Sequence, residues 1–85
     1  MYMKNFKNKF MKAKILEIVN EIMMAKELPM LTTLNEDDRL REDLSLTSFD
    51  LAELTVKIED EYDVDIFEDG LVNTIGDIIA KLEQK

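Results

Sequence analysis

Apolar residues in the first half of the chain predict one long amphipathic helix. From Phe10 to about Lys26 they recur at intervals of three and four residues, the spacing of one helix face. The expected buried stripe of this helix consists of Met11, Ile15, Leu16, Ile18, Val19, Ile22 and Met23. Pro29 should end the helix, because the residue before a proline is pushed out of the α region.

The second half of the chain predicts two further helices. One spans about Ser48 to Tyr62 and has on its apolar side Phe49, Leu51, Leu54, Val56, Ile58 and Tyr62. The last helix opens at Thr74, where Thr74 and Asp77 have the spacing of a capping box with Asp in place of Glu. Its expected buried residues are Ile75, Ile78, Ile79 and Leu82.

The segments between these helices differ in length and in expected role. Residues 28–46 form a long connection, and loops of this length without regular structure are usually functional. Four irregularly spaced leucines should hold this connection against the helices: Leu31, Leu34, Leu40 and Leu44. In the acidic connector after residue 62, residues 68–72 are expected to form at most one weak helical turn, since they include Gly70.

Composition places the chain in the all-helical class. Its 85 residues are enough for one small domain, and only 2 glycines and 1 proline are available for turns. We divide the chain into a basic flexible leader, residues 1–10, and a folded domain, residues 11–85. No apolar run approaches the length of a membrane span, and no secretory signal is visible, so we expect a cytoplasmic monomer without stable membrane insertion.

Charge and residue content exclude several functions. The net charge of −8 argues against nucleic acid as a partner and favours basic protein surfaces. The chain has no cysteine and no histidine, which removes thiolate nucleophiles, the usual zinc ligands and any imidazole base. We therefore expect no catalytic residue, no metal site and no enzyme activity.

The start of the second predicted helix is the candidate site. Ser48 would place a hydroxyl where backbone N–H groups lack partners and the helix dipole is positive, so a phosphate ester there would be favoured. Most hydroxyl residues in such a place are only N-caps, and Thr47 or Ser48 could be one. At the other end of the same helix, Glu59, Asp60 and Glu61 crowd the last turn, where helix physics disfavours negative charge and a basic partner would explain it.

Three blocks of sequence resemble the acyl carrier protein family. Asp43, Leu44, Ser48 and Glu53 match a family motif in which the serine is modified. The segments 59–66 and 74–79 are similar to the family's acidic helix end and to its fourth-helix start. Together the blocks cover about residues 11 to 83, in the family's order. Thr47, Phe49 and Ser45 stand where the family has Asp, Leu and Gly.

The resemblance implies a fold, a cofactor and a set of partners. It implies a small four-helix bundle with a long first loop and a short third helix, and 4′-phosphopantetheine carried by Ser48. A phosphopantetheinyl transferase would attach this arm from coenzyme A, and the arm's thiol would hold an acyl group as a thioester. Further partners would be loading ligases, synthases and acyltransferases with basic docking patches. By position, the docking residues would be Asp50, Glu53, Val56, Glu59 and Asp60.

Two other interpretations remain open on sequence. An aminoacyl or peptidyl carrier, including a D-alanyl carrier, would use the same serine and arm, and the acidic second helix favours the acyl form. An interaction module would use the acidic helix with Ser48 unmodified.

Overall fold

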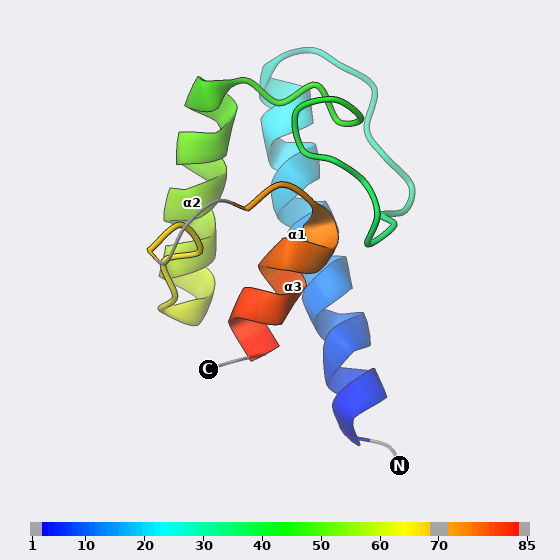
Figure 1. The fold of residues 1–85 in the computed structure, drawn as a ribbon. Helices are drawn as coiled ribbons and strands as arrows, with labels where there is room; N and C mark the ends of the chain where they lie inside the picture. The colour runs from blue at the N-terminus through cyan, green and yellow to red at the C-terminus, as the bar shows by residue number, and fades with distance from the viewer. Residues whose placement is uncertain (1–2, 69–71, 84–85) are drawn as a thin grey trace.

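The structure, a computed structural model, is all-helical and describes residues 3–68 and 72–83, with side chains from residue 9 onward. Its described part contains three helices: α1 (Met3–Ala25), α2 (Ser48–Tyr62) and α3 (Ile75–Glu83). Helices α1 and α2 run antiparallel, and α3 crosses α1 obliquely (Figure 1). The all-α class is confirmed.

The predicted four-helix bundle is not confirmed. The expected short helix at residues 68–72 falls partly on residues 69–71, which lie outside the described residues. Just before that gap the chain makes a turn, in which the Glu68 N–H donates to the Asp65 carbonyl at 3.2 Å.

Helix α1 is longer than its hydrophobic stripe. The predicted start at Phe10 is wrong, because the helix begins at Met3 and residues 3–10, expected to form a flexible leader, are helical. No proline or glycine interrupts this segment, so helical hydrogen bonding continues beyond the part that packs on the core.

The end of α1 is set by a backbone cap that comes before Pro29. Glu27 adopts a left-handed conformation with φ of 60°. The N–H of Leu28 then donates to the Met23 carbonyl at 2.9 Å, and the N–H of Glu27 to the Met24 carbonyl at 3.0 Å. This is the Schellman arrangement, which satisfies carbonyls at the helix end. The proline therefore follows a helix that has already ended.

One hydrophobic core joins the three helices and the long connection. Six of the seven α1 residues predicted to be buried are so, and Leu16 is half-buried against them. All four predicted α3 residues are buried. In α2 the core residues are Leu51, Leu54 and Ile58, whereas Phe49 is 80% exposed and Val56 65% exposed. Our assignment of Phe49 and Val56 to the apolar side was wrong, because both lie off the stripe formed by the other three.

The long connection is fixed to the rest of the molecule at two levels. Of the four leucines predicted to hold it, Leu34, Leu40 and Leu44 are buried and Leu31 is half-buried. Leu46, which was not predicted, is also buried. Its backbone also pairs with the start of α3, where Leu40 N–H donates to the Asn73 carbonyl at 2.8 Å and Ile75 N–H to the Asp38 carbonyl at 3.0 Å.

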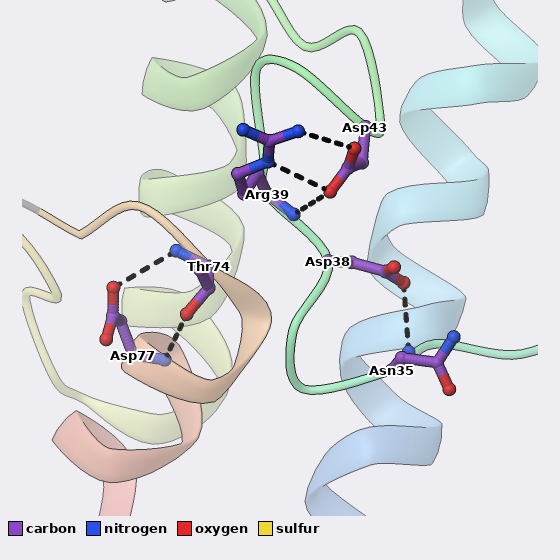
Figure 2. Close-up of polar contacts among 6 residues, drawn as sticks. All are labelled: Asn35, Asp38, Arg39, Asp43, Thr74 and Asp77. Atoms are coloured by element: carbon purple, nitrogen blue, oxygen red, sulfur yellow. Dashed lines mark hydrogen bonds and ion pairs between the residues drawn. The ribbon is translucent and has the colours of Figure 1, made fainter.

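Side-chain contacts stiffen this connection locally (Figure 2). Asp38 accepts from the backbone N–H of Asn35 at 2.9 Å, and Asp43 accepts from the backbone N–H of Arg39 at 2.8 Å. The Arg39 guanidinium also contacts the Asp43 carboxylate at 3.3 Å. The segment that leads into α2 is therefore an ordered loop that starts from a defined position beside α3.

Candidate functional site at the start of helix α2

Thr47 is the N-cap of α2. Its hydroxyl accepts from the backbone N–H of Asp50 at 3.1 Å, and the Asp50 carboxylate accepts from the backbone N–H of Thr47 at 2.9 Å. This reciprocal pair is a capping box, formed here with Asp instead of Glu. Of the two capping candidates in the sequence, Thr47 holds the role, so the hydroxyl of Ser48 is not required for it.

Asp50 is buried and not on the surface. It is 5% exposed, and its carboxylate accepts from the Lys26 ammonium at 2.6 Å. This contact, followed by the Thr47 backbone hydrogen bond, holds the pKa of Asp50 below its usual range. The expected docking role of Asp50 is corrected accordingly: its carboxylate joins the start of α2 to the end of α1 and has no free face for a partner.

Ser48 is the first residue of α2, and its side chain is exposed. Its Oγ accepts a hydrogen bond from the Arg41 guanidinium at 2.9 Å. The first backbone N–H groups of a helix have no partner inside the helix, so the surroundings of this hydroxyl are electropositive. Ser48 is thus accessible, beside a cation, and held on a helix start whose position is fixed by the cap.

The residues flanking Ser48 leave it uncovered. Phe49 points its ring into solvent, at 80% exposure. Ser45, three residues before Ser48, has φ of 61°, a left-handed conformation that favours glycine. Between these two residues Leu46 is buried, and it ties the loop to the core.

The outer side of α2 is acidic toward its C-terminal end, where Glu59 and Asp60 are exposed. Of the remaining predicted docking residues, Val56, Glu59 and Asp60 are exposed and Glu53 is half-buried. An open depression is lined by Val56, Lys57, Glu59, Asp60 and Asp63. Lys57 is the basic residue of α2, and its ammonium lies 3.1 Å from Glu21 of α1. The structure therefore brings Val56, Glu59 and Asp60 together on one surface and sets Asp50 apart.

Sequence reasoning missed two residues of the site, Lys26 and Arg41. Lys26 was the last residue of a predicted helix, and only the packing of α1 on α2 brings it to Asp50. Arg41 precedes Ser48 by seven residues in an irregular loop, so no periodicity relates them. The positive charge of each was visible, but nothing in the sequence indicated its position.

Comparison with known proteins agrees with this site. Residues 13–82 match the family described as "Phosphopantetheine attachment site". The chain is 34% identical over 74 residues to an acyl carrier protein of Streptococcus thermophilus, covering 85% of this chain and 90% of that protein. It is 35% identical to those of Rickettsia canadensis and Rickettsia typhi, covering 85% of this chain and 81% of each.

These matches define a carrier domain with a phosphopantetheine attachment site. The chain belongs to the acyl carrier protein family, and 4′-phosphopantetheine is the family's cofactor. The start of α2 fits this group, because it offers an exposed hydroxyl with a guanidinium 2.9 Å away to face a phosphate. Within the described residues, no helix is long and apolar enough to cross a membrane.

Proposed function

We propose that the protein carries acyl groups as thioesters on a 4′-phosphopantetheine arm attached to Ser48. The observation that carries this proposal is the exposed Ser48 hydroxyl at the start of α2, next to a cap that does not use it. The chain has only one other serine, Ser45, which lies in the loop before the helix. The carrier would act in the cytoplasm, as expected from the sequence.

The attachment chemistry requires a separate enzyme. The Ser48 oxygen would form a bond to the phosphorus of the pantetheine phosphate in coenzyme A, and the diphosphate P–O bond would break to release 3′,5′-ADP. The hydroxyl proton would pass to a base on the transferase. This chain supplies no histidine or cysteine for that step, and the neighbouring Arg41 donates hydrogen bonds but cannot accept a proton.

Partner enzymes would dock on the outer side of α2. Glu53, Glu59 and Asp60 would meet basic residues of the partner, and exposed Val56 would add an apolar contact. Charge pairing of this kind speeds encounter without requiring very high affinity, which suits a carrier that must bind and release repeatedly. The partners would be a phosphopantetheinyl transferase, a loading ligase, synthases and acyltransferases.

We assign the cargo as acyl intermediates of fatty-acid, polyketide or related biosynthesis. The names of the similar proteins and the acidic α2 favour this class over an aminoacyl, peptidyl or D-alanyl cargo. The same attachment residue would serve either class, so the site assignment can be tested before the cargo is known.

The first experiment measures the intact mass of the full chain after incubation with coenzyme A and a broad-specificity transferase. We expect the wild type to gain the mass of one phosphopantetheine group. Ser48→Ala should fold and gain nothing. The matched control is Ser45→Gly, which removes the other serine at a position that already has a glycine-like φ and should load fully. Loading of Ser48→Ala, or none on folded wild type, would refute the assignment.

The docking surface is tested by charge reversal. Asp60→Lys should slow association with the transferase several-fold at low ionic strength, and the effect should shrink as salt is added. Asp37→Lys makes the same change in net charge on the long connection, away from α2, and serves as the matched control. Equal rates for the two variants would place the docking surface elsewhere.

A further inference from the structure

The two arginines of the chain have different partners. Arg39 is committed to Asp43, which it contacts through both its backbone N–H and its guanidinium. Arg41 forms no ion pair among the described residues. Its guanidinium instead donates a hydrogen bond to Ser48 Oγ at 2.9 Å. An exposed arginine directed at a neutral hydroxyl, in a chain with 19 acidic residues, requires an explanation.

The neighbouring polar groups at the start of α2 are engaged elsewhere. Lys26, which directly follows α1, is paired with the buried carboxylate of Asp50. Thr47, which directly precedes Ser48, is neutral and occupied in capping. Among the described residues, the Asp50 carboxylate is paired with Lys26, and no ion pair with a carboxylate engages the Arg41 guanidinium.

A guanidinium in this position is suited to a phosphate group. It presents five N–H donors in a planar fork that matches the geometry of phosphate oxygens, and charge-assisted hydrogen bonds are about twice as strong as neutral ones. A phosphodiester formed on Ser48 Oγ would place non-bridging oxygens next to the atom that Arg41 already contacts. The neutral hydroxyl uses only part of the capacity of the fork.

We propose that Arg41 binds the phosphodiester of the modified protein and fixes the protein-proximal end of the phosphopantetheine arm. This inference rests on the proposed attachment at Ser48. Arg41 is a positioning residue in this proposal: it contacts the phosphate, while the thiol at the far end of the arm remains free to move. It also offsets the negative charge that modification adds to a chain already at −8.

The first test uses wild-type protein before and after modification, with NMR of the arginine side chains. The two arginines give separate signals, which Arg39→Gln assigns. On loading, the guanidinium signals of Arg41 should shift, and those of Arg39 should remain in place. Added salt should move the Arg41 signals back toward their positions in the unmodified protein.

The second test compares Arg41→Gln with the matched variant Arg39→Gln in both forms of the protein. The quantity compared is the change in the folding equilibrium constant that modification causes in each protein. At low salt this change should be roughly two- to five-fold less favourable in Arg41→Gln than in wild type, which is the size of an exposed ion pair. Arg39→Gln should respond to modification as wild type does. The ³¹P shift of the phosphodiester should also differ between Arg41→Gln and wild type.

The outcomes separate this inference from the proposed function. If the mass experiment shows no group on Ser48, the attachment proposal fails. The other outcome is that Ser48 is modified while the Arg41 signals stay in place on loading and the ³¹P shift is the same in Arg41→Gln and wild type. That result would overturn only the role of Arg41.

Discussion

The starts of α2 and α3 use the same capping chemistry for opposite purposes. Residues 47–50 (Thr-Ser-Phe-Asp) and residues 74–77 (Thr-Ile-Gly-Asp) each form a reciprocal Thr–Asp capping box. At the start of α2, Ser48 and Phe49 are exposed and Asp50 is buried. At the start of α3 the pattern is reversed, because Ile75 is fully buried and Asp77 is exposed.

This difference shows that a cap locates a helix but does not decide which side of its first turn faces solvent. The α3 start lies under the long connection, which approaches so closely that Gly76 N–H donates to the Glu36 carbonyl at 2.9 Å. The α2 start is held from its buried side by Lys26, which turns Ser48 outward. Only one of the two helix starts can therefore serve as an attachment point.

The strongest contrast in stability should come from the same substitution at the first helical residue of α2 and of α3. Ile75→Ala should cost about 2–5 kcal/mol of unfolding free energy, because it removes a fully buried side chain from the core. Ser48→Ala should cost less than about 0.5 kcal/mol, since Thr47 supplies the cap. Urea denaturation followed by circular dichroism measures both. Similar costs would mean that the two starts are not packed differently.

The two aspartates should also differ. Asp50→Ala loses a capping partner and leaves Lys26 without its carboxylate, so we expect a cost of about 2–3 kcal/mol. Asp77→Ala removes an exposed carboxylate that accepts from the backbone N–H groups of Thr74 and Asn73 and leaves no cation unpaired, at a cost of about 1 kcal/mol. The same denaturation measurement applies, with Lys26→Met as the control that removes the cation. A double variant Lys26→Met/Asp50→Ala that simply adds the two single costs would contradict the coupling.

The third pair of positions tests the close approach at α3. A Cβ on Gly76 would lie 3.0 Å from the backbone oxygen of Glu36, so the connection would have to move. Gly76→Ala should cost about 1–2 kcal/mol despite the higher helix propensity of alanine. Phe49→Ala, at the equivalent position of α2, should change stability by less than about 0.5 kcal/mol. Thermal unfolding of the two variants beside wild type is sufficient, and a stabilised Gly76→Ala would show that the connection yields freely.

The smallest effect is the pH dependence of the buried pair. The Lys26 ammonium lowers the pKa of Asp50 in the folded protein, so the stabilisation is present above the unfolded pKa, near 3.8, and is lost as pH falls through the lower folded pKa. The difference in unfolding free energy between wild type and Asp50→Asn should therefore shrink on acidification below about pH 4. The comparison with this variant cancels the relief of repulsion among exposed acids. A difference that stays constant down to the acid limit would argue against the ion pair.

Local sequence patterns were sufficient for the helices and most of the core. Of the six residues predicted for the apolar side of α2, Leu51, Leu54 and Ile58 are buried, and the Thr–Asp spacing predicted the start of α3. The prediction was wrong where hydrophobicity alone was used, as for Phe49 and Val56, since an apolar residue need not face the core when neighbouring positions already fill it. It was also wrong for the start of α1, because a helix can extend beyond the residues that pack.

Residue types and their spacing already specify the all-helical class, the lack of a histidine or cysteine for catalysis, the acidic second helix and the resemblance that singles out Ser48. These properties follow from residue type and short-range spacing, which the chain carries without folding. Packing of the folded chain makes Thr47 the cap, pairs buried Asp50 with Lys26 and brings the Arg41 guanidinium within hydrogen-bond distance of Ser48 Oγ. Those contacts join residues from α1, the long connection and α2, and their geometry is set by how the elements pack, which no local pattern encodes.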